Sequence, residues 1–138
     1  MPKRSPPKST LPAYDRDNVF AKILRGEAPC TKVYEDEFAL AFLNIHPRTP
    51  VHVLVVPKGE YVSGVDFSTL ASPELIVGFW RAVKQTATKL GLDEPGYRII
   101  ANHGPDANQV VFHFHVHILG GERLGSVSGT PPGPGIGT

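Results

Sequence analysis

Three of the chain's six histidines alternate with apolar residues in one short stretch, and this alternation constrains the fold more than any other feature of the sequence. The stretch reads Val111-Phe112-His113-Phe114-His115-Val116-His117-Ile118-Leu119. A period of two is that of a β-strand, on which successive side chains project from opposite faces. The imidazoles would then share one face and the apolar side chains the other. A strand with one wholly apolar face packs on a core, so the sequence predicts a sheet that is covered on that face.

Four further strands are predicted ahead of the histidine stretch. They are residues 31–34, 38–43, 51–56 and 97–102. The strand 51–56 is apolar on both faces except for His52, which is typical of a central strand, and Pro57 ends it. Because most of these strands follow one another through short turns, the sequence favours an antiparallel sheet.

Two helices are predicted from capping residues and apolar spacing. Asn18 is a good N-cap for a short helix over residues 19–25, and the glycine that follows would end it. A longer helix should begin at Pro73, after the N-cap Ser72. Its apolar residues recur at three- and four-residue spacing along one stripe, and Gly91 ends it. A helix packed on an antiparallel sheet gives the fold class α+β.

The composition argues against several classes of protein. A length of 138 residues suits one domain. The formal net charge of +1 argues against a nucleic-acid partner, which would require a strongly basic face. No apolar run is long enough to span a membrane, so no membrane partner is expected. Cys30 is the only cysteine, which excludes an intrachain disulfide and a cysteine-based zinc site and suits a reducing compartment.

The two ends differ in composition from the middle of the chain. Residues 1–14, rich in proline and basic residues, are predicted to form a flexible N-terminal arm. Residues 122–138 form a tail rich in glycine and proline, which leaves 15–121 as the domain. The arm lacks the apolar segment of a secretory signal, so the cytoplasm is the expected location.

An alternating run of histidines first suggests zinc, and strand geometry tests this interpretation. With a rise of about 3.3 Å per residue, His113 and His117 lie roughly 13 Å apart at their backbones. Zinc ligands must bring their nitrogens to within roughly 3.5 Å of one another. Three histidines of one straight strand cannot do this, and His46, His52 and His103 are the only others. We therefore expect no resident metal and no cofactor.

The second interpretation is that a neutral imidazole acts as a nucleophile toward phosphorus. Such a site needs one reactive histidine, a group that fixes its tautomer and donors for the phosphate oxygens. Three histidines on one strand face, together with the central His52, would supply these groups. Histidines that merely face solvent are the simpler alternative, but that alternative fits one histidine better than three in alternation.

Several blocks of the sequence resemble the histidine triad (HIT) family. The blocks are residues 18–27, 41–45, 49–58, 97–104 and 113–119. The last one reads His, apolar, His, apolar, His and two apolars, which is the family's signature, and Gln109 precedes it at the family's spacing. The blocks are collinear over about residues 15–121. They look most like the branch of nucleoside phosphoramidate hydrolases and their bacterial relatives.

The resemblance implies a fold, a reaction and partners. The family's fold is a five-stranded antiparallel sheet with two helices, usually in a homodimer. Its members bind nucleotides and hydrolyse or transfer nucleotidyl groups. We therefore expect a homodimer and a purine nucleotide or nucleoside phosphoramidate as the ligand.

The resemblance also implies a role for each site residue. His115 would attack the α-phosphorus and form a nucleotidyl-histidine that water then cleaves. His113 and His52 would orient His115, while His117 and Asn102 would hold phosphate oxygens. The nucleotide-binding residues that the resemblance implies are Asn102, Asn44, Ile45, Phe20, Ile23, Phe42, Gln109 and Val110. Among them, Asn44 would contact the ribose hydroxyls. The phenylalanines and isoleucines would line the pocket for the base. The alternative role for Phe20, Ile23 and Phe42 is plain packing in the core.

The sequence departs from the family's pattern at a few positions. Val110 stands where the phosphoramidase branch usually has a serine that helps bind or protonate the leaving nitrogen. Asn44 replaces a common aspartate, which would bond a ribose hydroxyl more strongly. Asn18 and Ala21 stand where some bacterial members have two zinc-binding cysteines. The third histidine, His117, favours a hydrolase over the uridylyltransferase relatives, which have glutamine there.

Three functions are compatible with these features. The first is a hydrolase of nucleotidyl conjugates that works through a covalent histidine intermediate. The second is a purine nucleotide-binding or interaction module with little activity, which the departures at Val110 and Asn44 favour. The third is a metal-dependent hydrolase.

Overall fold

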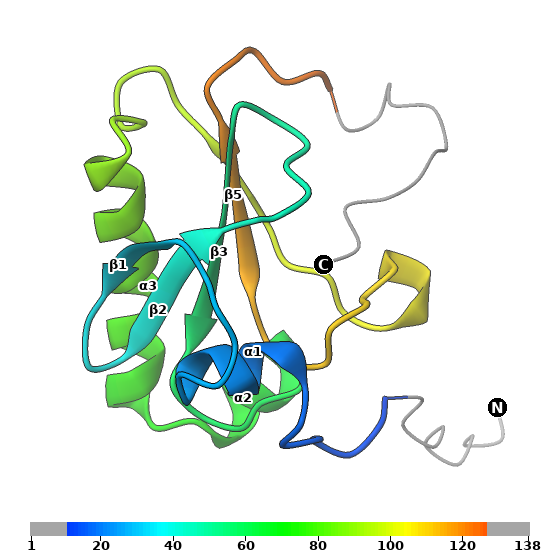
Figure 1. Cartoon of the computed structure of the whole chain (residues 1–138). Coiled ribbons are helices and arrows are strands. Elements are labelled where there is room, and N and C mark those ends of the chain that lie inside the picture. Colours follow the sequence, from blue (N-terminus) through cyan, green and yellow to red (C-terminus); the bar gives the residue numbers. More distant parts are fainter. Residues whose placement is uncertain (1–10, 127–138) are drawn as a thin grey trace, which may run out of the picture.

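The computed structural model describes residues 11–126, which form a single five-stranded antiparallel sheet with helices on both faces (Figure 1). The first ten residues of the predicted arm and the last twelve of the predicted tail lie outside the described residues. The elements in chain order are α1 (Val19–Leu24), β1 (Lys32–Glu35), β2 (Ala39–Leu43), β3 (Val51–Pro57), α2 (Gly64–Leu70), α3 (Pro73–Lys89), β4 (Arg98–Ile100), the short 3₁₀ helix η1 (Pro105–Ala107) and β5 (Val116–Gly120).

The strand order in the sheet is β1-β2-β3-β5-β4, and each neighbouring pair is antiparallel. The predicted α+β class and the five-stranded antiparallel sheet are therefore confirmed. The most apolar strand, β3, lies at the centre, as its sequence predicts. It places His52 next to β5, where Leu119 is its register partner.

The sheet separates two groups of buried side chains. The larger group packs between the sheet and α3, which runs alongside the strands in Figure 1, and it includes Val53, Phe79 and Val116. The smaller group lies on the opposite face with α1, and it includes Phe20 and Leu54. Both faces of the sheet are therefore covered, and a side chain on either face can be buried.

The two predicted helices begin and end where their caps indicate. The Asn18 side chain accepts a hydrogen bond from the backbone N–H of Ala21 (2.9 Å), which caps α1. The Ser72 side chain caps α3, with Pro73 in the first turn. Gly91 follows α3 at φ +75°, a conformation that glycine adopts without strain.

The prediction of only two helices is wrong, because α2 is a third. It has seven residues and begins at a glycine, so its apolar pattern is too short to be conspicuous. Its sequence signal is a capping box, in which the Ser63 side chain accepts from Val65 N–H and the Asp66 carboxylate accepts from Ser63 N–H.

The predicted histidine strand is partly wrong in extent. Strand β5 begins at Val116, so only His117 of the three histidines lies within it. The chain leaves the sheet before that point because the Phe114 N–H donates to the Tyr61 carbonyl (2.7 Å). The histidines and apolar residues do take opposite faces, but the histidine face is covered rather than exposed to solvent.

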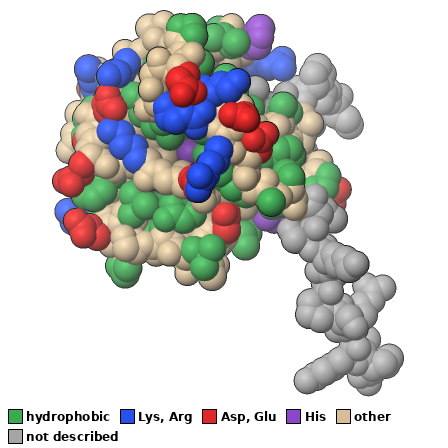
Figure 2. All heavy atoms as spheres, turned by 60° about the horizontal axis from the view of Figure 1, so that its bottom comes forward, with side chains coloured by type: hydrophobic (Ala, Val, Ile, Leu, Met, Phe, Trp, Pro, Cys, Tyr) green, Lys and Arg blue, Asp and Glu red, His purple; other side chains and the backbone are tan. Residues whose placement is uncertain are grey.

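Charged side chains of both signs are interspersed on the face that Figure 2 shows. Several charged side chains of the described residues form ion pairs, among them Arg16 with Glu60 and Lys58 with Glu35. None of the helices within residues 11–126 has the length and apolar character needed to cross a membrane.

Candidate active site

Four histidines from three parts of the chain meet on the α1 face of the sheet. His52 comes from β3 and His117 from β5, while His113 and His115 lie just before β5. At most 2% of any of the four residues is exposed to solvent. Burial of this degree removes water as a hydrogen-bond partner, so the protein itself determines which ring nitrogen carries the proton.

Burial also keeps three of these imidazoles neutral. It lowers the pKa of His113 to about 4 and the pKa of His117 to about 3. Burial lowers the pKa of His52 as well. Each of these rings therefore carries one N–H near pH 7, and its other nitrogen is an acceptor.

The ring of His113 is held at both nitrogens. Its Nε2 lies 3.1 Å from the carbonyl oxygen of Pro57, and because a carbonyl only accepts, Nε2 is the donor. Its Nδ1 is then an acceptor, and the Tyr14 hydroxyl donates to it (2.7 Å). The His113 ring is thus fixed in one orientation and one tautomer.

His115 is fixed by the backbone of His113. Its Nδ1 lies 2.7 Å from the His113 carbonyl oxygen, which requires the proton on Nδ1. In the neutral ring, Nε2 then carries a lone pair. The Phe20 ring packs against this imidazole nearly at right angles, with ring centroids 5.0 Å apart. The Nε2 nitrogen is itself buried in the site. A neutral imidazole nitrogen that carries its lone pair is the form that can attack phosphorus.

His52 and His117 form a second hydrogen-bonded pair. The backbone N–H of Arg48 donates to His52 Nδ1 (3.0 Å), so His52 carries its proton on Nε2. That Nε2 donates to His117 Nδ1 (2.9 Å), which leaves the His117 proton on its own Nε2. The His117 Nε2 is buried and makes no hydrogen bond within the described part of the chain.

The two hydrogen-bonded pairs place an acceptor nitrogen and an N–H donor on adjacent rings. The His115 and His117 rings lie 5.2 Å apart, centroid to centroid. His115 offers an acceptor nitrogen and His117 an N–H donor. We expected His52 to orient His115, but its hydrogen bond is to His117, so it acts on the donor of the pair instead. An anionic group between the two rings would meet a nucleophile and a hydrogen-bond donor together.

An apolar pocket of about 160 Å³ adjoins the histidines on the α1 side. Its lining is Val19, Phe20, Ile23, Pro29, Cys30, Phe42, Leu43, Asn44, Ile45, His46, Leu54 and Val111. Phe20 joins the pocket to the site because it also contacts His115. All four residues expected at a base, and Asn44, are among the lining residues. An aromatic ring can pack in such a pocket, against side chains such as Phe20 and Phe42.

The structure gives burial and few contacts for the other residues that were expected to bind the nucleotide. Asn44 is buried beside the histidines, with Nδ2 3.2 Å from His52 Nε2. Asn102 is half-buried, two residues after β4. Val110 is 54% exposed.

The Gln109 side chain is hydrogen-bonded within the loop that precedes β5 and to the segment before α2. Its Nε2 donates to the carbonyls of Val62 (2.7 Å) and Val111 (3.2 Å), and its Oε1 accepts from Gly104 N–H (3.1 Å). These bonds use both N–H groups and one lone pair of the amide, and they hold the loop before β5 in place.

Two contributors have no clear signal in the sequence. Tyr14 falls at the end of the predicted arm, yet its hydroxyl reaches His113. The backbone N–H of Arg48 sets the tautomer of His52, and any residue other than proline could donate there. Neither contact follows from a local sequence pattern such as strand alternation or helix capping. Among residues 11–126, no three histidine, cysteine or carboxylate side chains are grouped so as to hold a metal ion.

Fold and site together define an α+β protein in which hydrogen-bonded histidines lie beside an apolar pocket. The model of the HIT domain family matches residues 25–124. The chain therefore belongs to the HIT family.

Individual relatives agree with this assignment. An uncharacterized 13.2 kDa HIT-like protein from Azospirillum brasilense is 56% identical over 112 residues, which are 81% of this chain and 92% of that protein. A HIT family hydrolase from Legionella pneumophila has a solved structure that superimposes with a TM-score of 0.76, at 36% identity, over 82% of this chain and all of that one. A histidine triad nucleotide-binding protein from Candida albicans superimposes with a TM-score of 0.67, at 29% identity, over 80% of this chain and 85% of that one.

Proposed function

We propose that this protein hydrolyses conjugates of nucleoside 5′-monophosphates, such as phosphoramidates, through a covalent nucleotidyl intermediate on His115. The observation that carries the proposal is the tautomer of His115, whose Nδ1–H is held by the His113 carbonyl (2.7 Å). This bond leaves Nε2 as the nucleophile without any need for a base.

The first step forms the intermediate. His115 Nε2 attacks the α-phosphorus while the bond from phosphorus to the leaving nitrogen breaks, and the leaving amine takes a proton from water. The His115 ring gains positive charge, which the bond from its Nδ1–H to the His113 carbonyl stabilises. The N–H on His117 Nε2 would donate to a phosphate oxygen and stabilise its developing charge.

The second step regenerates the enzyme. Water attacks the same phosphorus and gives up a proton to the hydroxide that the first step left behind. The bond from phosphorus to His115 Nε2 breaks, and its electron pair returns to that nitrogen. The products are the free amine and the nucleoside 5′-monophosphate. Because the neighbouring imidazoles have pKa values far below 7, they stay neutral and do not repel the cationic intermediate.

The apolar pocket supports a nucleotide as the substrate. Its lining residues Phe20 and Phe42 pack edge to face on each other, with ring centroids 5.5 Å apart, and together they form an aromatic wall against which a base could pack. The name of the Candida albicans neighbour as a nucleotide-binding protein, and of the Legionella pneumophila neighbour as a hydrolase, supports the same conclusion.

The test is a panel of adenylated and guanylated substrates with wild type and His115→Ala. We expect wild type to turn over a phosphoramidate and, after rapid denaturation, to carry the mass of one nucleotidyl group. His115→Ala should lose turnover by at least about a thousandfold while still binding the nucleoside monophosphate. Equal turnover by both proteins, or a wild type without any adduct, would contradict the covalent mechanism. Loss of wild-type activity on chelation would favour a metal-dependent hydrolase.

A second candidate function is nucleotide binding with little turnover. Val110, apolar and 54% exposed, offers no hydroxyl to the leaving group. Asn44 already accepts from His46 N–H (2.8 Å). Calorimetry that finds tight binding of adenosine monophosphate by a wild type without turnover would favour this function.

A further inference from the structure

We infer that Tyr14 is a positioning residue of this site, which holds His113 so that the His113 carbonyl keeps His115 in its reactive tautomer. The inference rests on the proposed function and adds to the site a residue from the segment before α1. Tyr14 lies 99 residues from His113 in the sequence, and its hydroxyl is 2.7 Å from His113 Nδ1.

The direction of this hydrogen bond follows from the other end of the same ring. His113 Nε2 must donate to the Pro57 carbonyl, so Nδ1 can only accept and the Tyr14 hydroxyl must donate. The two rings also meet edge to face, with centroids 5.6 Å apart. Burial raises the pKa of Tyr14, which keeps its proton in place near pH 7.

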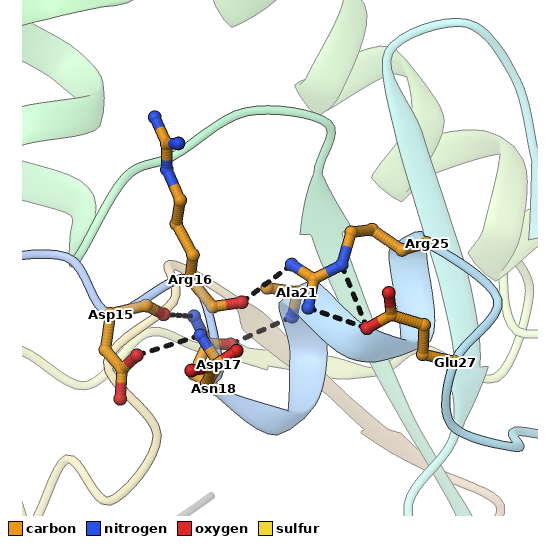
Figure 3. Close-up of polar contacts among 7 residues, drawn as sticks. All are labelled: Asp15, Arg16, Asp17, Asn18, Ala21, Arg25 and Glu27. Carbon is orange, nitrogen blue, oxygen red and sulfur yellow. Dashed lines mark hydrogen bonds and ion pairs between the residues drawn. The ribbon is translucent and has the colours of Figure 1, made fainter.

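The segment that carries Tyr14 is itself fastened to α1 (Figure 3). The Asp15 carbonyl accepts from the Asn18 backbone N–H (3.1 Å) and from its side chain (2.7 Å). The Arg16 carbonyl accepts from the Arg25 guanidinium (2.6 Å), which also bonds Glu27. These contacts hold the backbone on the side of Tyr14 that leads into α1, so its hydroxyl is presented to His113 from an ordered segment.

Two bonds on the ring and one on the backbone make His113 the link between Tyr14 and the nucleophile. The ring is held by Tyr14 and Pro57, and the carbonyl of the same residue accepts from His115 Nδ1. Without the hydroxyl, the buried His113 Nδ1 would lose its donor. The ring would then reorient or change tautomer, and the short bond from its carbonyl to His115 would be disturbed.

The test compares Tyr14→Phe with Tyr34→Phe. Tyr34 is a matched control because its hydroxyl also donates a hydrogen bond, to Asp36 (2.9 Å), but on β1. We expect Tyr14→Phe to lower kcat about tenfold with KM little changed, because a misplaced nucleophile slows the chemical step. Tyr34→Phe should leave both constants near the wild-type values.

Nitrogen NMR of the histidine rings provides a readout that does not depend on activity. Wild type should show His113 protonated on Nε2 and His115 protonated on Nδ1. In Tyr14→Phe, the His115 ring should become a mixture of tautomers, and in Tyr34→Phe it should not. Unchanged His115 tautomers, or an unchanged kcat in an active enzyme, would overturn the inference. If wild type has no turnover, the proposed function fails, and the tautomers alone decide whether Tyr14 positions His115.

Discussion

At the scale of single residues, hydrogen bonding and burial together give four histidines different tasks. His113 and His52 each have both ring nitrogens engaged, so they hold neighbours in place. His115 is left with a lone pair and His117 with an N–H. The difference comes from two backbone groups: the His113 carbonyl, which only accepts, and the Arg48 N–H, which only donates. A fixed pattern of backbone donors and acceptors therefore gives identical side chains different hydrogen-bonding roles, an acceptor nitrogen at His115 and a donor at His117.

The buried histidines predict how stability depends on pH. The pKa values of His113 and His117 are about 4 and about 3 in the folded chain, against about 6.5 when unfolded. Below pH 6.5 the unfolded chain binds protons that the folded chain does not. The free energy of unfolding should therefore fall by about 1.4 kcal/mol per pH unit for each of these histidines, starting near pH 6.5.

Urea denaturation at a series of pH values between 8 and 5 measures this slope. The control is His46→Gln, which removes an exposed histidine instead of a buried one. A free energy of unfolding that stays constant from pH 7 to pH 5 would contradict the assignment of neutral, buried histidines.

At the scale of elements, the N-cap residue of α2 makes more hydrogen bonds than the N-cap residue of α3, so we expect it to contribute more to stability. Ser63 is 1% exposed, and its hydroxyl both caps α2 and lies 2.8 Å from His103 Nδ1. This contact joins α2 to the loop after β4, next to Asn102. Ser72 caps α3 at the surface and accepts only the ordinary capping bond from Leu75 N–H (3.1 Å).

Removing the two caps should therefore have unequal costs. We expect Ser63→Ala to lower the free energy of unfolding by about 2 kcal/mol, because it removes both the capping bond and the hydrogen bond to His103. Ser72→Ala should cost about 1 kcal/mol. Denaturant unfolding of both variants measures the difference, and equal losses would refute a special role for the Ser63 side chain.

At the scale of the whole molecule, one sheet edge and one helix face expose apolar side chains. Strand β4 is an edge strand of three residues, and Ile99 in it is 41% exposed. Trp80 on α3 is 43% exposed and packs edge-on against Phe79, so it is not a fully buried core residue. These features are compatible with the homodimer that the resemblance implies.

We expect sedimentation at micromolar concentration to give twice the 15.0 kDa mass of one chain. Ile99→Asp should dissociate the dimer if the β4 edge is the interface, because a buried unpaired carboxylate is unfavourable. Val65→Asp is the control, since Val65 is 58% exposed on α2. A wild type that sediments as a monomer would refute the dimer.

Local sequence patterns determined the architecture but not the chemistry of the site. Alternation in residues 113–119 determined which side chains face the core, and the caps Asn18 and Ser72 determined where two helices begin, because these signals act within a few residues. The tertiary structure alone decided that the histidine face is buried, that His52 donates to His117 and that Tyr14 holds His113. Those partners lie 65 and 99 residues apart, and a ring's tautomer depends on which group the fold brings against it.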